Sequence, residues 1–408
     1  MARVVLIGTY DTKGAEYRFV RKTLASVGIE SLTVDVGILG DSPDVDIDNH
    51  TVAAAGGSSL AQLRARKDRG EAVGAMTVGA RKIVGDLVDE GAVHGILGLG
   101  GTGGTTLVTA VMRALPIAFP KVMVSTVAAG DTRQYFGTSD ITMMYSVVDI
   151  AGLNSVSMPI LANAAGAIAG MVRTASAEAA TKPVVAATMF GVTTPAVQAA
   201  RARLEELGYE VLVFHATGVG GASMERLVDA GMIAGVLDLT TTELADELVG
   251  GVFSAGETRL TAAGKVGIPQ VVSFGALDMV NFGPPETVPA EFRERNLHVH
   301  NASVTLMRTT VDESRTLGRR IAERLSVAKG AVTVVIPLGG ISAIDAHGQP
   351  FHDPDADAAL FEAFEANVAP RIALLKRQAH INDPELAVEM AELLHAHISG
   401  QRDKEQHG

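Results

Sequence analysis

Short aliphatic runs spaced along the whole chain constrain its fold more than any other feature of the sequence. Most are continuous stretches of Val, Ile, Leu and Ala without regular polar alternation, which is typical of parallel strands buried on both faces of a sheet. Helical patterns separate several of them, at 15–27, 105–115, 195–207 and 224–230. The predicted strands lie at 3–8, 31–36, 95–99, 122–126, 184–188, 211–215, 234–239, 270–274 and 332–337. This order predicts βαβ units with right-handed crossovers.

The two halves of the chain resemble each other. A strand, a Gly/Thr-rich turn, an amphipathic helix and a second strand begin at Val4, and the same series begins at Val184. The helices end before Gly28 and Gly208, as expected of glycine stop signals. We therefore expect an α/β fold of two Rossmann-like parallel-sheet subdomains, related by structural duplication, with a ligand cleft between them.

The expected subdomains have unequal lengths. The first spans residues 1–178 and carries an insertion at about 37–90, between its second and third strands. The second spans residues 179–408 and ends in a helical tail. At 408 residues the chain is long enough to bury two hydrophobic cores without a disulfide or a structural metal.

Composition excludes several classes of protein. With no Cys, the chain has no disulfide, thiolate nucleophile or cysteine-bound metal. A net charge of −12 and the absence of Trp argue against nucleic-acid binding. Neither a signal peptide nor a membrane-spanning run is recognisable. We expect a cytoplasmic protein with no nucleic-acid or membrane partner.

The strongest local motif is GLGGTGGTT, which follows a predicted strand and opens a helix. Successive glycines allow backbone N–H groups to converge on an anion, and the helix N-terminus adds a favourable dipole. The motif lacks both the later acidic residue of a dinucleotide site and the GK[ST] of a P-loop. The predicted phosphate-binding residues here are Gly100, Gly101, Thr102, Gly103, Gly104 and Thr105. The alternative is a tight packing turn that requires small residues.

A second motif, GTYDTKG, ends the first strand. Lys13 could neutralise a phosphate, and Asp11 could hold Mg²⁺ or a ribose hydroxyl. The predicted ligand-binding residues are Gly8, Thr9, Asp11, Thr12 and Lys13. The alternative is a helix N-cap formed by Asp11 or Thr12, with Lys13 in solvent.

A third candidate is the long polar loop after the fourth predicted strand. Loops at the carboxyl ends of strands are where ligand-binding residues gather. From this loop we select Thr126, Gly130 and Asp131, with Asp131 as a second candidate for Mg²⁺ or ribose. The alternative is a plain surface turn.

The second half offers a weaker candidate, a substrate pocket. Its glycines could bind an anion, and its histidine has a pKa suited to proton transfer. The residues are His215, Gly218, Gly220, Gly221, Ser273 and Asp278. The alternative is a structural histidine, and Thr240, Thr241 and Thr242 are best interpreted as the start of a helix.

Two histidine clusters raise the question of a metal. His298 and His300 have strand spacing, and His347 and His352 lie in an acidic loop. The acidic loop is equally well explained as a helix start, with Asp353 as N-cap. We assign no metal site. The chain has no nucleophile-elbow motif either, so nothing supports a serine hydrolase.

The motifs GTYDTKG, GLGGTGGT, STVAAGDT, FHATGVGG and IPLGGISAID occur together and in order. In this the chain resembles, over about residues 1–400, the family named after the ATP-binding N-terminal domain of the tomato mosaic virus resistance protein. The resemblance implies two α/β subdomains, a tendency to dimerise, and ATP binding by the first subdomain. Carried to this sequence, ATP binding falls on 8–14 and 100–105, with 126–131 as neighbours.

These observations together predict a homodimeric protein that binds ATP or another phosphorylated small molecule, with Mg²⁺ as a possible companion. Any reaction would be phosphoryl or nucleotidyl transfer to a small metabolite, and no catalytic residue is assigned. Two alternatives stay open. One is a non-catalytic ATP-sensing module that a protein partner recognises. The other is a sugar or organic-acid enzyme that does not use ATP.

Overall fold

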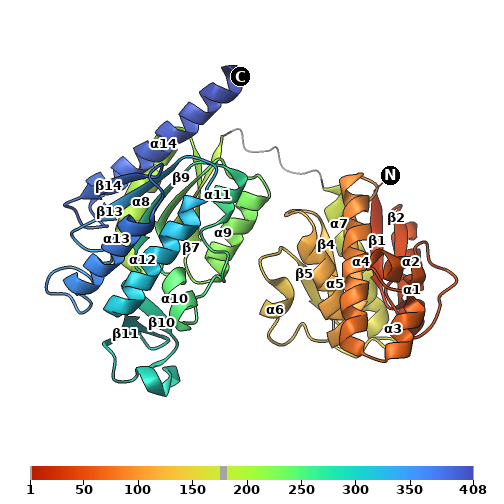
Figure 1. Ribbon diagram of the computed structural model, residues 1–408. Coiled ribbons are helices and arrows are strands. Elements are labelled where there is room, and N and C mark those ends of the chain that lie inside the picture. The colour runs from red at the N-terminus through yellow and green to blue at the C-terminus, as the bar shows by residue number, and fades with distance from the viewer. Residues whose placement is uncertain (1, 175–181, 408) are drawn as a thin grey trace. The chain divides into compact units, whose positions relative to one another are not determined.

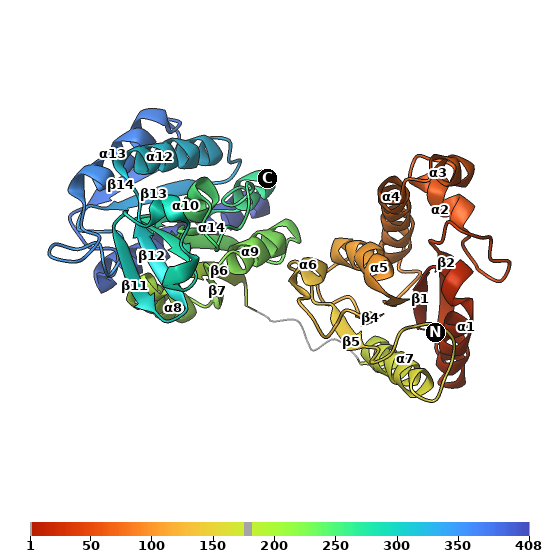
Figure 2. The same ribbon diagram turned by 90° about the horizontal axis from the view of Figure 1, so that it is seen from below.

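The computed structural model describes residues 2–174 and 182–407, and the chain divides into two compact units, Met1–Ala179 and Ala180–Gly408. Each unit contains a parallel sheet with helices packed on its faces (Figures 1 and 2). The expected α/β fold with two Rossmann-like parallel sheets is confirmed. The boundary predicted between residues 178 and 179 lies outside the described residues, and the expected ligand cleft between the subdomains stays a prediction.

The sheet of the first unit has five parallel strands in the order β2-β1-β3-β4-β5. Four were expected from their aliphatic runs. The fifth is a short edge strand whose side chains are largely exposed, so it lacks the buried-strand pattern. The strands are β1 (Arg3–Gly8), β2 (Glu30–Asp35), β3 (Gly95–Gly100), β4 (Lys121–Ser125) and β5 (Thr142–Tyr145).

Helices cover both faces of this sheet. Side chains of α1 (Tyr10–Ser26) and α7 (Ser157–Arg173) form one hydrophobic core with it. On the other face lie α5 (Thr102–Ala114) and the helices of the insertion. The insertion consists of α2 (Asn49–Ala55), α3 (Leu60–Arg66) and α4 (Arg69–Asp89), and α6 (Arg133–Phe136) follows β4.

The sheet of the second unit has six parallel strands in the order β14-β13-β9-β8-β6-β7. Its first four strands in the sequence repeat the order of the first four in unit one, which supports the duplication. The edge strand β14 was not expected. The strands are β6 (Val184–Met189), β7 (Glu210–His215), β8 (Gly235–Thr240), β9 (Gln270–Gly275), β13 (Val332–Pro337) and β14 (Ala373–Arg377).

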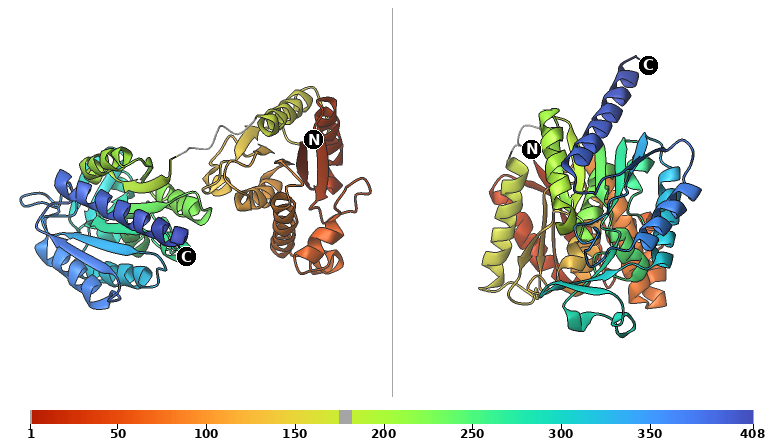
Figure 3. Two further views of the ribbon diagram at one scale, coloured as in Figure 1. Left: turned by 90° about the horizontal axis from the view of Figure 1, so that it is seen from above. Right: turned by 90° about the vertical axis from the view of Figure 1, so that its left-hand side faces the viewer.

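Long helices flank this second sheet as well (Figure 3). One core contains side chains of α8 (Thr194–Glu206) and α14 (Pro384–His407), and another contains those of α12 (Val311–Ser326) and α13 (Pro354–Asn367). The shorter helices are α9 (Val219–Asp229), α10 (Glu243–Val249) and α11 (Ala262–Val266), with 3₁₀ turns at Gly191–Thr193, Pro285–Thr287 and Ala290–Phe292.

A small antiparallel sheet in the second unit was not predicted. It contains β10 (Met279–Phe282), β11 (Leu297–Asn301) and β12 (Val304–Arg308), in the order β10-β12-β11. Met279 and Leu306 of this sheet pack against Phe190, directly after β6, in one buried cluster. Protein therefore covers part of the carboxyl edge of the second parallel sheet.

One buried hydroxyl joins the two central strands of the first unit. The Tyr17 hydroxyl donates a hydrogen bond of 2.5 Å to the carbonyl of Ile7 in β1 and accepts one of 2.9 Å from the amide of Leu99 in β3. Tyr17 is fully buried, so these groups have no access to water. Gly8 makes room for the ring, because a Cβ there would lie 1.8 Å from the hydroxyl oxygen. The carboxyl ends of β1 and β3 are thus held together.

Replacing Tyr17 with Phe should lower the free energy of unfolding by about 1–3 kcal/mol, because the amide of Leu99 loses its acceptor in a buried place. Urea titration of the purified variant measures this. Tyr10→Phe is the matched control. Its hydroxyl only donates to the Leu6 carbonyl, so its loss should cost less. A Tyr17→Phe variant as stable as the unaltered protein would contradict this description of the strand pair.

A second buried group carries charge. Asp278, Asp345 and Asp357 surround Arg308, whose Nη2 lies 2.6 Å from Asp357 Oδ1 and 3.5 Å from Asp345 Oδ1. The Oδ1 atoms of Asp278 and Asp345 have no hydrogen-bond partner. One guanidinium cannot balance three buried carboxylates. Burial and the neighbouring carboxylates raise the pKa of Asp345 to about 9, so this carboxyl is protonated at neutral pH.

The raised pKa of Asp345 gives a pH prediction with a definite sign. The folded state holds this proton more tightly than the unfolded chain, whose Asp has a pKa near 3.8. This group therefore destabilises the fold progressively as the pH rises from about 4 to about 9. Asp345→Asn cannot ionise, so its stability relative to the unaltered protein should increase between pH 5 and pH 9.

Urea unfolding at several pH values checks this. Asp131→Asn serves as the control, since the Asp131 side chain is exposed and its pKa is about 2, below the range tested. If the free energies of unfolding of Asp345→Asn and the unaltered protein change equally with pH, Asp345 is not held protonated in the folded state.

Candidate functional site

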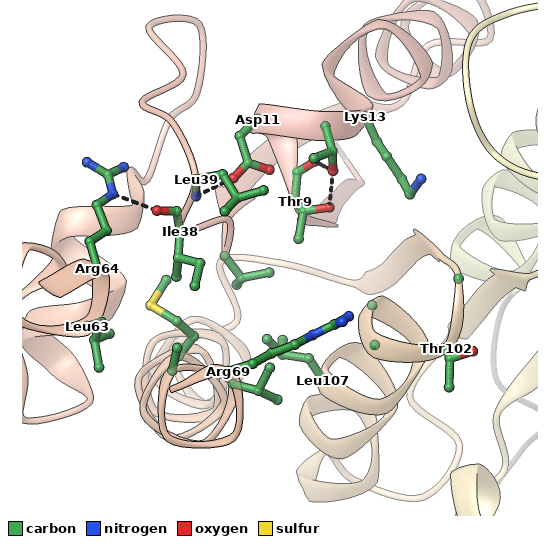
Figure 4. Close-up of a pocket in the computed structure, with 18 of the residues that line it drawn as sticks. Thr9, Asp11, Lys13, Ile38, Leu39, Leu63, Arg64, Arg69, Thr102 and Leu107 are labelled. Atoms are coloured by element: carbon green, nitrogen blue, oxygen red, sulfur yellow. Dashed lines mark hydrogen bonds between the residues drawn. The ribbon is translucent and has the colours of Figure 1, made fainter. Parts of the chain in front are cut away.

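The strand order of the first unit makes the connections after β1 and β3 diverge at the carboxyl edge of the sheet. The helix that follows β1 packs on one face of the sheet, and the helix that follows β3 packs on the other. Doubly wound sheets bind ligands at such a point, outside the carboxyl ends of the two strands. A pocket of about 1060 Å³ opens there (Figure 4). We call it the glycine-loop pocket, and its lining includes Thr9, Asp11, Thr12, Lys13, Ile38, Leu39, Leu63, Arg64, Lys67, Arg69, Met76, Gly101, Thr102, Gly103, Gly104 and Leu107.

One end of the pocket is formed by the first turn of α5. Gly101 is the N-cap residue and, having no side chain, caps no amide. The amides of Thr102, Gly103 and Gly104 occupy the helix positions that have no acceptor within the helix. They also carry the positive end of the helix dipole. Gly100 is needed behind them, because a Cβ there would lie 3.0 Å from the backbone of Gly104.

The turn after β1 forms a second wall. Thr9 and Thr12 share a hydrogen bond between hydroxyls of 2.8 Å. Lys13 departs from helical backbone angles, and its Nζ donates to the carbonyl of Ile150 at 2.5 Å. Asp11 Oδ2 accepts a hydrogen bond of 2.8 Å from the amide of Leu39, which fixes the segment after β2 against α1. Charged and hydroxyl groups therefore face the pocket from this side.

The insertion supplies the third wall and a cation. Arg69 is the first residue of α4, and its Nη2 lies 2.9 Å from where a Cβ of Gly103 would be. Figure 4 shows the guanidinium extending toward the glycine loop, with Lys13 on the opposite side of the pocket. Within residues 2–174 and 182–407, the Arg69 side chain forms no hydrogen bond or ion pair. An unpaired guanidinium beside free amides is suited to an anion.

Eight residues predicted to bind the cofactor line this one pocket. They come from the first two predicted motifs and are Thr9, Asp11, Thr12, Lys13, Gly101, Thr102, Gly103 and Gly104. Gly8, Gly100 and Thr105 lie behind them. Gly8 makes room for Tyr17, and Thr105 shares a hydrogen bond of 2.7 Å with the Ser125 hydroxyl.

The third predicted loop does not reach the pocket lining. Thr126 flanks the glycine loop through a hydrogen bond from its amide to the Gly100 carbonyl. Gly130 and Asp131 lie in the turn beyond it. Arg133 binds the exposed Asp131 carboxylate and lowers its pKa to about 2. The structure thus brings together two of the three predicted loops of the first half.

Sequence reasoning missed the contribution of the insertion. Arg64 and Arg69 lie on the pocket wall, with apolar side chains such as Leu63 and Met76. A signal was available, since the run RARKDR places four basic residues within six positions from Arg64 to Arg69. The sequence could not show that this run folds back beside the glycine loop.

The glycine loop of the second unit, at 218–221, binds the carboxylate of a side chain in the same unit. The amides of Gly218 and Gly221 donate to Glu243 Oε1 at 2.7 and 3.0 Å, and Arg259 Nε donates to Glu243 Oε2 at 2.7 Å. Arg259 and Glu243 are fully buried. The backbone of Gly220 packs against that of His215. These two amides are therefore satisfied within the protein.

Of the other residues predicted for the substrate pocket, His215 immediately precedes that loop, and Ser273 and Asp278 have partners elsewhere in the fold. His215 is exposed, with its ring 5.5 Å from that of Phe190. The Ser273 hydroxyl donates to the Val335 carbonyl, and Asp278 belongs to the buried group around Arg308. A substrate-binding role for these residues stays a prediction.

The histidine clusters form no metal centre that the described ranges reveal, since no group of three His, Asp or Glu there has metal-binding geometry. The His347 and His352 rings lie 5.4 Å apart in an exposed loop. Asp353 caps α13 by accepting a hydrogen bond from the Ala356 amide, as the helix-start interpretation predicted. None of the helices in the described part of the chain is long and apolar enough to cross a membrane.

Comparison with solved structures adds nothing to the site. The glycosyltransferase SsfS6 of Streptomyces, solved with thymidine diphosphate, matches 67% of this chain and 82% of its own at 14% identity, with a TM-score of 0.22. MurG of Acinetobacter baumannii matches 99% and 95% at 12% identity, with a TM-score of 0.23. Superpositions this poor support no functional conclusion.

Comparison with known sequences identifies the family to which the chain belongs. A UPF0261 protein of Clostridium tetani is 51% identical over 96% of this chain and 98% of its own length. The ToMV resistance protein Tm-1(GCR237) of Solanum lycopersicum is 44% identical over 94% of this chain, which corresponds to 54% of the tomato protein. Family models for the N-terminal and C-terminal domains of uncharacterised protein family UPF0261 match residues 2–177 and 182–398. The chain therefore belongs to the UPF0261 family, to which the tomato Tm-1 proteins are similar.

Proposed function

We propose that the protein binds ATP, or another phosphorylated small molecule, in the glycine-loop pocket of its first unit. One observation carries the proposal. The uncapped first turn of α5 and the unpaired guanidinium of Arg69 meet at the same end of the pocket. A helix N-terminus with free amides attracts phosphate, and a guanidinium forms charge-assisted hydrogen bonds with phosphate oxygens.

Neighbouring residues support a ligand with several charges. Lys13 Nζ is bound only to a backbone carbonyl, which a phosphate oxygen could replace. The overall charge of −12 does not oppose this, because local amides and cations determine the potential inside a pocket. A polyphosphate would use both cations and the helix terminus together.

Asp11 is the residue best placed to hold Mg²⁺ beside the phosphates. Its Oδ1 has no hydrogen-bond partner, and its Oδ2 accepts only the Leu39 amide. Carboxylate oxygens together with phosphate oxygens are the usual protein ligands of Mg²⁺. Asp131 is less suited, because Arg133 already binds it.

The lining favours binding over a particular reaction. It includes no His, Glu, Tyr or Ser, so Asp11 and Asp68 are the acids that it offers, and Asp68 caps α4. Phosphoryl transfer needs mainly positioning and charge neutralisation, which such a pocket provides. A non-catalytic ATP sensor that a partner recognises is the second candidate, supported by the same absence of His, Glu, Tyr and Ser from the described lining. Homodimerisation and a cytoplasmic location are proposed with either.

Gly101→Asp separates ligand binding from folding. Gly101 has φ of −79°, and a Cβ there meets nothing closer than 3.7 Å, so a side chain fits. Asp at an N-cap stabilises a helix, so the melting temperature should be equal or higher. Its carboxylate would repel the phosphates and weaken ATP binding at least tenfold by calorimetry. Gly101→Ala is the control and should bind as the unaltered protein does. ATP binding that survives in Gly101→Asp would place the ligand elsewhere.

Arg69→Ala should weaken ATP binding by a factor of about 10–100, as expected for the loss of a hydrogen bond to a charged group worth about 1.5–3 kcal/mol. Arg66→Ala is a matched control, since Arg66 pairs with Glu71 and does not line the pocket. Titration calorimetry of both variants measures the difference. Equal affinities for the two variants would exclude Arg69 from the site.

A further inference from the structure

The two ends of the glycine-loop pocket differ in chemistry. The glycine-loop end has free amides and cations. The other end is lined by aliphatic side chains, and no aromatic ring lines it among the residues that the structure describes (Figure 4). These side chains come from the segment after β2, from the insertion and from α5, and they are Ile38, Leu39, Leu63, Val73, Met76 and Leu107. The part of a ligand beyond its phosphates can lie against this apolar wall when the phosphates are held at the first end.

Backbone groups at the apolar end are mostly engaged within the protein. The amide of Gly37 donates to Asp35 Oδ1, and the amide of Leu39 donates to Asp11 Oδ2, both at 2.8 Å. The Asn49 side-chain amide donates to the carbonyls of Gly37 and Gly40. The amide hydrogens of Gly37, Leu39 and Asn49 are therefore used within the protein and are not free to donate to a nucleobase.

Of the polar side chains near this end, Arg64 and Asp68 are engaged within the described part of the protein and Lys67 is not. Arg64 donates to the Ile38 carbonyl and to Asp41, and Asp68 accepts the amide of Glu71 as the cap of α4. Lys67 lines the pocket and forms no hydrogen bond or ion pair within the described ranges. Its ammonium group is a flexible point charge that can approach an acceptor on any of the four common bases.

We infer that the pocket selects its ligand by the phosphate chain and tolerates any base, so that its ligands are nucleoside polyphosphates as a class. This inference rests on the proposed function and narrows it. A site that hydrogen-bonds a ligand group can reject an analogue lacking it by a factor of 10⁴–10⁵, whereas apolar contacts discriminate by about 10–200-fold. The pocket, at about 1060 Å³, is also large enough for purines and pyrimidines alike.

Calorimetry of the full chain with ATP, GTP, CTP, UTP and inorganic tripolyphosphate tests the inference. The four nucleotides should have dissociation constants within about 200-fold of one another, the range that apolar contacts allow, and tripolyphosphate should bind more weakly than all of them. A preference above about 200-fold for one base would overturn the inference and leave the proposed function intact. If none of the five binds, the proposed function fails and the inference fails with it.

Two variants show how much each end of the pocket contributes to ligand affinity. Arg69→Ala should weaken all four nucleotides and tripolyphosphate by a similar factor, because it acts at the phosphates. Val73→Ala should weaken the four nucleotides equally and leave tripolyphosphate unchanged, because it removes apolar contact only. Val73 is only partly buried, so the fold tolerates this change. An unequal effect of Val73→Ala on the four bases would show that the apolar wall reads the base, against the inference.

Discussion

Three unpartnered backbone amides at the start of α5 are the constraint on which the candidate site depends. They are exposed to the pocket because Gly101 provides no capping side chain and because glycine at position 100 lets the first turn approach β3 closely. Thr102 is exposed and Gly103 and Gly104 are only partly buried, so a ligand in the pocket can accept hydrogen bonds from these amides. Tyr17 keeps this loop aligned with the turn after β1, since its hydroxyl binds both strands.

The second unit has the amides of its glycine loop hydrogen-bonded within the protein. Its strand order repeats that of the first, and the segment after β8 corresponds to the glycine loop after β3. There the chain has Glu243, whose carboxylate is bound by two amides of the other glycine loop and by Arg259. A carboxylate of the chain itself therefore satisfies the glycine-loop amides of the second unit, which follow β7. In the first unit, the amides at the start of α5 are open to a pocket.

Sequence reasoning reached most of the fold because strands buried on both faces need continuous aliphatic runs. It did not predict two edge strands or the antiparallel sheet. The strands β5 and β14 have exposed side chains, and the antiparallel sheet that includes β10 has no distinctive pattern. For the site, it found both loops at the carboxyl ends of β1 and β3, since glycine and hydroxyl residues mark such turns. It could not place Arg69, which reaches the glycine loop only through the packing of α4, or foresee that Glu243 fills the second glycine loop.

The most direct test follows the amides themselves. In a protein labelled with ¹⁵N at glycine, titration with ATP should shift the amide resonances of Gly103 and Gly104 and saturate at one equivalent per chain. The resonances of Gly218 and Gly221 should stay unchanged, because Glu243 already binds their amides. Shifts confined to Gly218 and Gly221, or none at Gly103 and Gly104 while ATP binds, would contradict the assignment of the anion site to the first unit.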